Sequence, residues 1–238
     1  MYLPTRAALL LVIGLLVSVQ AIAEGMSGQY DALGTTPEGK GYKGVVEIVD
    51  SGRLQSLFWK LQGGATYEGI GIQADGILGS AYGPPGSKFG LFVYRISGGT
   101  LDGVWGQSTD LKSELGRETL QGSAGLNGPY SITLGQNRDG ITNYGGEVVL
   151  QPNGDNFVMI RTINKKTTIG VGVRINDVLV VATGVGGPLP GVVAYEAQGS
   201  NSLSGIWSYV ALKQAGDHAF TIVGSKKLGT ERLIRAGQ

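Results

Sequence analysis

Short motifs of the chain recur in the same order about one hundred positions later. The offset is 100 to 102 positions for all pairs but the last, where it is 113. This pattern predicts a tandem duplication, with copies at residues 24–122 and 123–238 and an insertion around Val210–Ser225 in the second copy. The period far exceeds the repeats of about 20–50 residues found in solenoids and propellers, so each copy can be a domain-sized unit. The paired motifs are Gly28-Gln29-Tyr30 with Gly128-Pro129-Tyr130, Tyr42-Lys43-Gly44 with Tyr144-Gly145-Gly146, Gly69-Ile70-Gly71 with Gly170-Val171-Gly172, Tyr94 with Tyr195, Leu101–Trp105 with Leu203–Trp207, and Leu115–Glu118 with Leu228–Glu231.

The N-terminal residues 1–23 have the pattern of a secretory signal peptide. Arg6 supplies a positive charge, Ala7–Val17 is apolar, and Ala21-Ile22-Ala23 matches the small-x-small cleavage site. The apolar run is short for a membrane span of about 20 residues. We therefore expect cleavage before Glu24, no membrane span in the mature chain, and a periplasmic or secreted location.

The charge balance and the absence of cysteine limit the classes of partner that are expected for this protein. Without the signal peptide, the chain has 18 basic and 18 acidic residues and is formally neutral. Nucleic acids and anionic membranes usually require a basic patch, so neither is an expected partner. The chain has no Cys, and an exported protein without disulfides fits a bacterial envelope better than a small eukaryotic secreted domain.

The apolar runs are short, rich in β-branched and aromatic residues, and closed by turn residues. Val45–Val49 ends at Asp50-Ser51-Gly52, and Ile77–Tyr82 ends at Gly83-Pro84-Pro85-Gly86. This rhythm predicts an all-β fold with roughly eight antiparallel strands per copy, arranged as a meander. We expect two small closed barrels packed together, because closure removes unpaired strand edges. A larger sheet shared by both copies is the alternative arrangement.

Alternation along the strands indicates which faces are buried. In Leu57–Leu61, the Leu and Trp side chains fall on one face, with Phe58 and Lys60 on the other. In Leu91–Ile96 both faces carry apolar groups. Such strands are expected to lie between a barrel interior and another packed surface.

Three recurring elements are interpreted as structural. The Gly two residues before Trp105 and Trp207 allows close backbone approach, and the Trp is expected to plug one end of a barrel. The Gly-x-Gly motifs lack the following helix that a nucleotide site requires. Glu118 and Glu231 recur at one point of each copy and are expected to anchor a loop or to pair with the flanking Arg117 or Arg232. No second titratable group recurs with them, which argues against acid–base catalysis.

Groups for nucleophilic or metal chemistry are scarce. His218 is the single histidine and lies in the inserted segment of copy two. Without Cys or a Gly-x-Ser-x-Gly turn, neither a catalytic triad nor a zinc or copper site is predicted. We therefore expect a non-enzymatic protein with no catalytic residues, no metal site and no cofactor.

Differences between the copies are the better guide to a specialised site. Copy one has Trp59 where copy two has Arg161, and Tyr67 where copy two has Thr168. Copy one is thus richer in aromatic groups, and its interior is predicted to accept a small apolar ligand. Core packing is the other interpretation of these side chains. The predicted ligand-binding residues are Trp59, Tyr67, Tyr94 and Trp105.

The motifs of copy one also resemble those of a family of small exported bacterial β proteins. The matching residues are Tyr67–Gly71, Leu78, Tyr82-Gly83, Tyr94–Ile96, Leu101–Trp105 and Leu115–Leu120. Members are often labelled fibronectin-binding proteins, and the resemblance implies binding of an extracellular protein. Copy two departs from the pattern at Thr168-Ile169 and Ala182-Thr183. The fold is also loosely similar to avidin and lipocalin-type barrels, but in those the Gly-x-Trp lies on the first strand, so no ligand residues transfer.

Three functions are consistent with these features. The first is an exported β-barrel protein that binds a small apolar ligand or has a structural role in the envelope. The second is an adhesin-like module that binds a matrix or host protein through strand addition. The third is a single outer-membrane barrel of about 16 strands, although strand Lys and Arg residues and the C-terminal sequence Arg235–Gln238 disfavour it.

Overall fold

The computed structural model describes residues 26–123, 125–184, 190–214 and 220–237. The described residues form eighteen β-strands and no helix, which confirms the predicted all-β class. These described residues therefore include no helix that is long and apolar enough to cross a membrane. The strands are β1 (Gly28–Thr35), β2 (Gly41–Asp50), β3 (Gln55–Leu61), β4 (Thr66–Ala74), β5 (Ile77–Gly83), β6 (Phe89–Ser97), β7 (Thr100–Gln107), β8 (Gly116–Gly122), β9 (Gly128–Gln136), β10 (Glu147–Asn153), β11 (Asn156–Ile163), β12 (Lys166–Ile175), β13 (Val178–Gly184), β14 (Gly191–Ala197), β15 (Ser202–Ser208), β16 (Val210–Gln214), β17 (Phe220–Gly224) and β18 (Gly229–Arg235).

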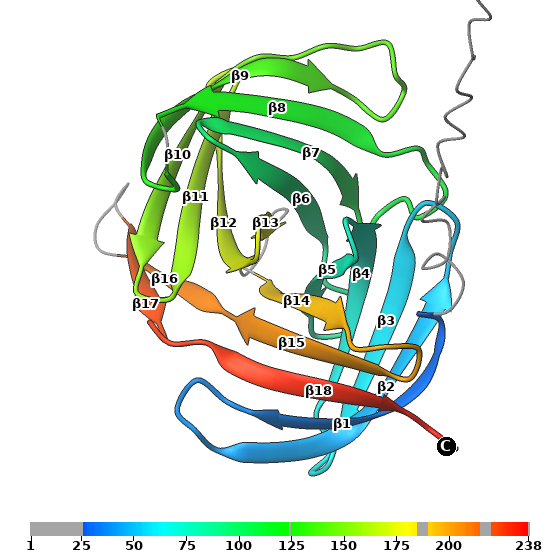
Figure 1. Cartoon of the computed structure of the whole chain (residues 1–238). Coiled ribbons are helices and arrows are strands. Elements are labelled where there is room, and N and C mark those ends of the chain that lie inside the picture. The colour runs from blue at the N-terminus through cyan, green and yellow to red at the C-terminus, as the bar shows by residue number, and fades with distance from the viewer. Residues whose placement is uncertain (1–25, 124, 185–189, 215–219, 238) are drawn as a thin grey trace, which may run out of the picture.

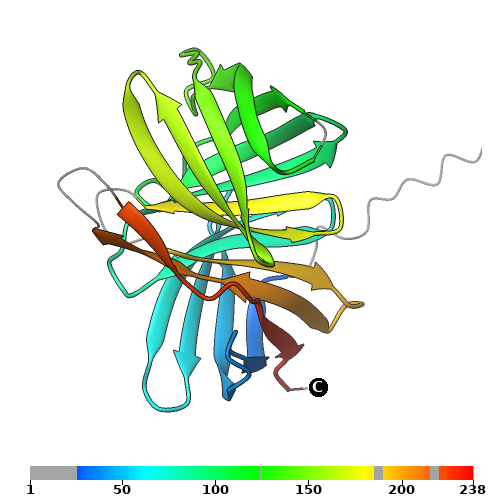
Figure 2. The same ribbon diagram turned by 90° about the vertical axis from the view of Figure 1, so that its left-hand side faces the viewer.

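Sixteen of these strands close into two antiparallel barrels of eight strands each, as predicted (Figure 1). One barrel has the strand order β1-β18-β15-β14-β5-β4-β3-β2, and the other has β10-β11-β12-β13-β6-β7-β8-β9. We name them the Glu231 barrel and the Glu118 barrel, after the buried glutamate inside each. Figure 2 shows the barrels stacked one above the other. The fold is thus neither one sixteen-stranded barrel nor one shared sheet.

The two barrels do not correspond to the two sequence copies, because the copies exchange strands. The Glu231 barrel takes β1–β5 from copy one and β14, β15 and β18 from copy two. The Glu118 barrel takes β6–β8 from copy one and β9–β13 from copy two. The exchange occurs because β5 pairs with β14 and not with the next strand β6, and β13 pairs with β6 and not with the next strand β14. The expectation that each copy closes by itself is therefore not met.

The apolar side chains form three cores, one inside each barrel and one between the barrels. The middle core uses the outward faces of β4, β5 and β14 from one barrel and of β6, β12 and β13 from the other. Leu91 and Val93 of β6 point into it, while Phe92 and Tyr94 point into the Glu118 barrel. This confirms that β6 lies between an interior and a second packed surface. The middle strands are consequently buried on both faces.

Glycines under aromatic rings explain the recurring Gly-x-Trp motif. A Cβ placed on Gly103 would lie 2.6 Å from the Tyr94 ring, and one on Gly205 would lie 2.4 Å from the Tyr195 ring. The tyrosine of the neighbouring strand thus lies directly across the glycine backbone, and no larger residue fits there. The motif positions the two tyrosines as well as the tryptophans.

The insertion in copy two contains the β16–β17 hairpin, which belongs to neither barrel. The chain after β17 runs back along the Glu118 barrel, where the Asn156 side chain donates to the carbonyl of Ser225 at 2.8 Å. The backbone N–H of Asp155 donates to the carbonyl of Lys226 at 2.7 Å. The segment before β18 is therefore fixed to one barrel while β18 itself closes the other.

Engineered cysteines can test the strand exchange, because the natural chain has none. Thr35 on β1 faces Thr230 on β18, with their hydroxyl oxygens 2.8 Å apart on the outer surface. The pair Thr35→Cys and Thr230→Cys is expected to form a disulfide under mild oxidation, since paired strand residues are close enough. Peptide mapping by mass spectrometry would detect the bond.

The matched control is Thr35→Cys with Arg117→Cys. Arg117 occupies the position in β8 that corresponds to Thr230 in β18, and it would face Thr35 if copy one closed by itself. In the exchanged fold Arg117 pairs with Gln136, so this pair should remain reduced. An intramolecular disulfide in the control, and none in the first pair, would contradict the exchange.

Candidate functional site

The strand exchange separates the four residues predicted to line one ligand site. Trp59 and Tyr67 lie in the Glu231 barrel, whereas Tyr94 and Trp105 lie in the Glu118 barrel. The copy-two counterparts of the last two, Tyr195 and Trp207, join Trp59 and Tyr67 around one cavity. The structure thus brings together half of the predicted set, with two partners that sequence reasoning did not select.

The Glu231 barrel contains a cavity of about 430 Å³ at the end where β1, β3, β5 and β15 finish. This volume lies in the range of small-molecule sites. Seven aromatic side chains surround it, and Glu231 is the single charged residue among the described lining residues. The lining residues are Thr36, Tyr42, Trp59, Leu61, Tyr67, Tyr82, Gly83, Pro84, Gly191, Val193, Tyr195, Trp207, Tyr209 and Glu231.

The aromatic walls of this cavity pack against one another. The Trp59 and Tyr82 ring centroids lie 5.6 Å apart, and Tyr67 meets Tyr82 edge-on at 5.7 Å. On the other side, Trp207 meets Tyr42 edge-on at 6.2 Å and stacks on Tyr209 at 6.1 Å. Such contacts hold the rings in place and shape a preformed aromatic cavity.

Glu231 projects from β18 and is 5% exposed. Its carboxylate accepts hydrogen bonds from the Tyr42 hydroxyl at 3.0 Å, from the Trp59 indole N–H at 3.2 Å and from the Tyr195 hydroxyl. All three donors are neutral. Among the described residues, Glu231 forms no ion pair with Lys, Arg or His.

Burial governs the protonation of this cluster. Desolvation raises the pKa of the Glu231 carboxyl, although the hydrogen bonds from Tyr195, Trp59 and Tyr42 oppose the shift. Desolvation, followed by the charge of Glu231, raises the pKa of the hydroxyls of Tyr42 and Tyr195. The tyrosines therefore remain protonated donors, and the negative charge on Glu231 is held in an unfavourable, poorly hydrated place.

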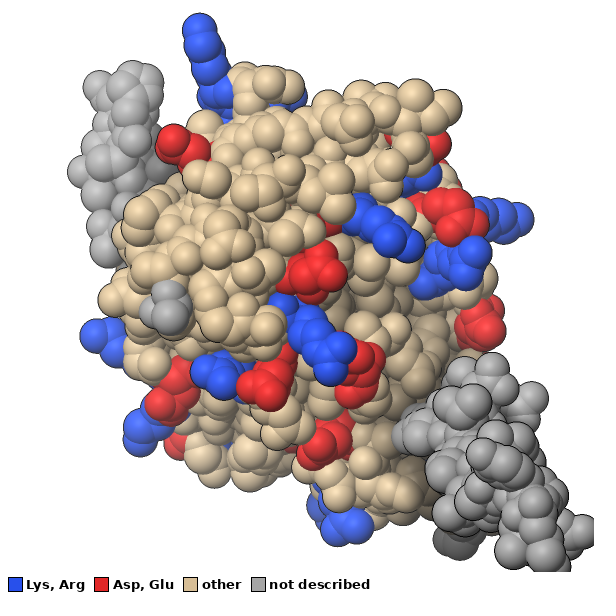
Figure 3. Space-filling view, turned by 45° about the horizontal axis from the view of Figure 1, so that its top comes forward, with Lys and Arg blue, Asp and Glu red and all other residues tan. Residues whose placement is uncertain are grey.

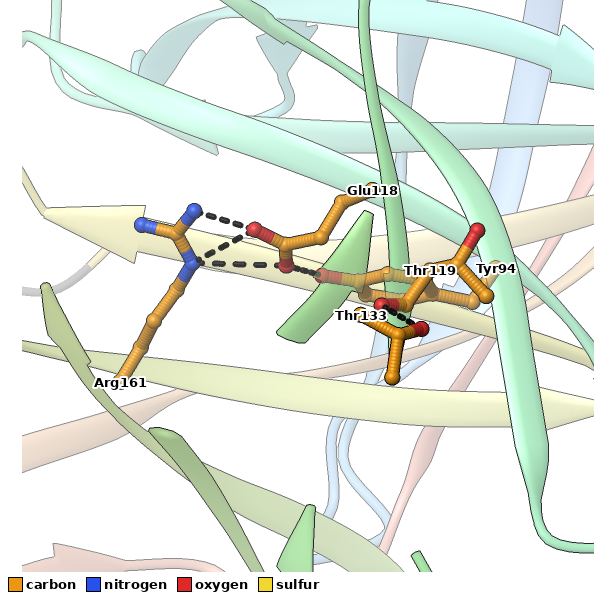
Figure 4. Close-up of polar contacts among 5 residues, drawn as sticks. All are labelled: Tyr94, Glu118, Thr119, Thr133 and Arg161. Carbon is orange, nitrogen blue, oxygen red and sulfur yellow. Dashed lines mark hydrogen bonds and ion pairs between the residues drawn. The ribbon is translucent and has the colours of Figure 1, made fainter. Parts of the chain in front are cut away.

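The Glu118 barrel contains the corresponding cluster with one decisive difference. Glu118 is fully buried and accepts a hydrogen bond from the Tyr94 hydroxyl at 2.5 Å, the counterpart of the Tyr195 contact. Where the other barrel has Trp59, this one has Arg161, which pairs with Glu118 through its Nε and Nη2 atoms. Figure 4 shows the guanidinium and the Tyr94 hydroxyl meeting the same carboxylate.

Arg161 also lies over two aromatic rings. Its Cζ atom is 5.1 Å from the centroid of Phe92 and 5.1 Å from that of Tyr144. These are cation–π distances. Although desolvation opposes it, the hydrogen bonds and charge of Glu118 raise the pKa of Arg161. The Glu118 barrel therefore contains its own cation, held between aromatic rings and a carboxylate.

A second cavity of about 400 Å³ lies at the equivalent end of the Glu118 barrel, and most of its lining residues are polar or charged. Phe92 lines this cavity at the position that Val193 occupies in the Glu231 barrel, because the two residues lie opposite Trp105 and Trp207. The lining residues are Gly90, Phe92, Trp105, Gln107, Asn137, Thr142, Asn143, Tyr144, Arg161, Ile163, Asn164, Lys166, Thr168 and Thr183.

The interpretation of the two glutamates as partners of their flanking arginines is wrong. Arg117 and Arg232 are exposed, because neighbours along a strand point to opposite faces. Glu118 instead pairs with Arg161, and tyrosines recur as partners in both barrels. In the sequence, the recurrence of Tyr42 as Tyr144 and of Tyr94 as Tyr195 is the pattern that could have indicated tyrosine partners for the glutamates. It could not show which copy supplied each partner.

The described residues contain no group of three or more His, Cys, Asp or Glu side chains that could hold a metal ion. His218 lies outside them. Comparison of the chain with protein-family models, with curated proteins and with solved structures found no match. The resemblance to exported bacterial β proteins therefore stays a prediction.

Removing one partner of the Glu118–Arg161 pair is expected to be strongly destabilising. Arg161→Met would leave Glu118, which is fully buried, without its cation. Breaking a buried pair from one side costs about 3–5 kcal/mol, so the free energy of unfolding in urea should fall by that amount. The control Arg174→Met removes an exposed ion pair with Asp177 and should cost less than about 1 kcal/mol. Equal losses would contradict the proposed role of Arg161.

The raised pKa of Glu231 predicts a pH dependence of opposite sign to that of a salt-bridged carboxylate. The Glu231 carboxyl binds its proton more tightly in the folded protein than in the unfolded chain, where the pKa of this carboxyl is near 4.5. Stability from this group is therefore complete below that value and is lost as the pH rises through the raised pKa. The unfolding free energy of Glu231→Gln, relative to wild type, should accordingly increase from about pH 4 to about pH 8.

The comparison protein for this pH series is Glu47→Gln, on the solvent face of β2. It removes the same formal charge from the same barrel without altering the interior. A constant difference between Glu231→Gln and wild type over the whole series would show that burial does not disfavour the Glu231 charge.

Proposed function

We propose that the protein is an exported, non-enzymatic β-barrel protein that binds a small, largely apolar ligand in the Glu231 barrel. The observation that supports this most is the asymmetry between two otherwise equivalent barrel interiors. One has Arg161 and Phe92 at positions where the other has Trp59 and Val193, next to an aromatic cavity of about 430 Å³. The two cavities have similar volumes, about 430 and 400 Å³, so it is the aromatic lining and the carboxylate without a cationic partner among the described residues that support the Glu231 barrel as the site.

The location of the cavity is suited to binding. Its lining includes Thr36 after β1, Pro84 after β5 and Tyr209 after β15, so it lies at a barrel end and not in the closed centre. The opposite end is filled by the buried side chains of Tyr30, Leu203 and Leu233. A ligand would therefore enter from one end and rest on the ring of hydrogen bonds around Glu231.

Binding to an extracellular protein by strand addition has less support. In a closed barrel every strand is paired on both sides, so no edge is available to an extended peptide. Within the described residues, only the β16–β17 hairpin leaves strand edges unpaired. On the face seen in Figure 3, basic and acidic side chains are interspersed, and neither sign forms a continuous patch.

Filling the cavity should abolish ligand binding without unfolding the protein. Val193→Phe places in the Glu231 barrel the side chain that the Glu118 barrel already accommodates as Phe92. We expect wild type to bind the neutral apolar fluorophore N-phenylnaphthylamine with one site per chain, and the variant to lose that site. Fluorescence titration would measure binding, and native mass spectrometry would show any ligand retained from the cell.

Val49→Phe is the matched control, since it makes the same substitution on the outer face of β2. This variant should bind the fluorophore as wild type does. Identical binding by Val193→Phe and wild type would place the fluorophore outside the cavity and would refute the proposal.

A further inference from the structure

We propose that the ligand of the Glu231 barrel is a small organic cation, such as a quaternary or alkylated ammonium, held with its charge against Glu231 and its alkyl groups against the aromatic walls. This inference rests on the proposed binding function and names the chemical class of the ligand. It follows from comparing the two barrels position by position.

In the Glu118 barrel, the cluster of a buried glutamate, a tyrosine and aromatic rings surrounds a cation. There the cation is the guanidinium of Arg161, which lies over the rings of Phe92 and Tyr144 and pairs with Glu118. The protein has thus built a site for a cation from a buried carboxylate, a hydrogen-bonding tyrosine and aromatic faces. The carboxylate, the hydrogen-bonding tyrosine and the counterpart of Tyr144 recur in the other barrel as Glu231, Tyr195 and Tyr42, whereas Phe92 is replaced by Val193.

In the Glu231 barrel the position of Arg161 is occupied by Trp59, whose indole N–H donates to the carboxylate at 3.2 Å. No Lys, Arg or His is among the described residues that line the cavity. A carboxylate offers about four acceptor positions, and neutral donors occupy three of those on Glu231. No cation among the described residues therefore compensates the buried charge, and one acceptor position on Glu231 stays available.

The cavity walls match the same ligand class. Aromatic rings present a negative face, and cages of such rings recognise quaternary ammonium groups because the cation loses little when it leaves water. Trp59, Tyr67 and Tyr82 form one side of the cavity, and Tyr42 and Trp207 form another. A neutral ligand would use the aromatic surface but would leave Glu231 without a counter-charge, and an anion would be repelled by it.

The test compares two probes of the same shape, phenyltrimethylammonium and tert-butylbenzene, which differ in a quaternary nitrogen against a quaternary carbon. Titration followed by tryptophan fluorescence would give both dissociation constants for the full chain. We expect the cation to bind at least about tenfold more tightly, as attraction to aromatic faces and a buried carboxylate requires. Equal binding, or preference for the neutral probe, would overturn the cation inference but leave the proposed function standing. Binding of neither probe would overturn both.

Two variants locate the preference at Glu231. Glu231→Gln should lose most of the preference for the cation and keep only the part that the aromatic faces supply, while Glu47→Gln should keep the wild-type preference. Trp59→Arg keeps Glu231 and supplies an internal cation as in the Glu118 barrel, so it should lose binding of phenyltrimethylammonium even if Glu231→Gln fails to fold. A cation preference that survives in Trp59→Arg, or that is undiminished in folded Glu231→Gln, would show that Glu231 is not the counter-charge.

Discussion

Two antiparallel pairings, β5 with β14 and β6 with β13, determine how the rest of the chain is arranged. They direct the first five strands of each copy into the same barrel as the last three barrel strands of the other copy, which are β6–β8 in copy one and β14, β15 and β18 in copy two. Neither copy can complete a barrel by itself, and the paired strands bury both faces. The apolar layer between the barrels is therefore part of what closes them, and the two barrels are expected to fold as one unit.

The exchange also sets the electrostatics of the two interiors. Glu118 from copy one meets Arg161 from copy two, and Glu231 from copy two meets Trp59 from copy one. One barrel thereby contains a compensated buried ion pair, and the other contains a carboxylate among neutral donors and aromatic rings. An uncompensated buried charge is costly to stability, and the second arrangement is therefore the main support for the proposed binding site.

The all-β class, the short strands and the two barrels could be predicted because they depend on local signals: alternation and turn residues. The exchange could not, because β6 and β14 have the same inward tyrosine, Tyr94 or Tyr195, and similar outward residues such as Leu91 and Val192. Judged by residue pattern alone, either β6 or β14 could pair with β5. For the same reason Trp59 and Tyr67 could be recognised as unusual, but their partners in space, Tyr195 and Trp207, could not be assigned.

A double-mutant cycle tests the central claim most directly, because it measures which glutamate shares a barrel with Arg161. The unfolding free energies of Arg161→Met, Glu118→Gln and the double variant would give one coupling energy, and the same set with Glu231→Gln would give the other. We predict a coupling above about 1.5 kcal/mol with Glu118 and within about 0.5 kcal/mol of zero with Glu231. Strong coupling of Arg161 to Glu231, with none to Glu118, would contradict the exchanged fold and the site derived from it.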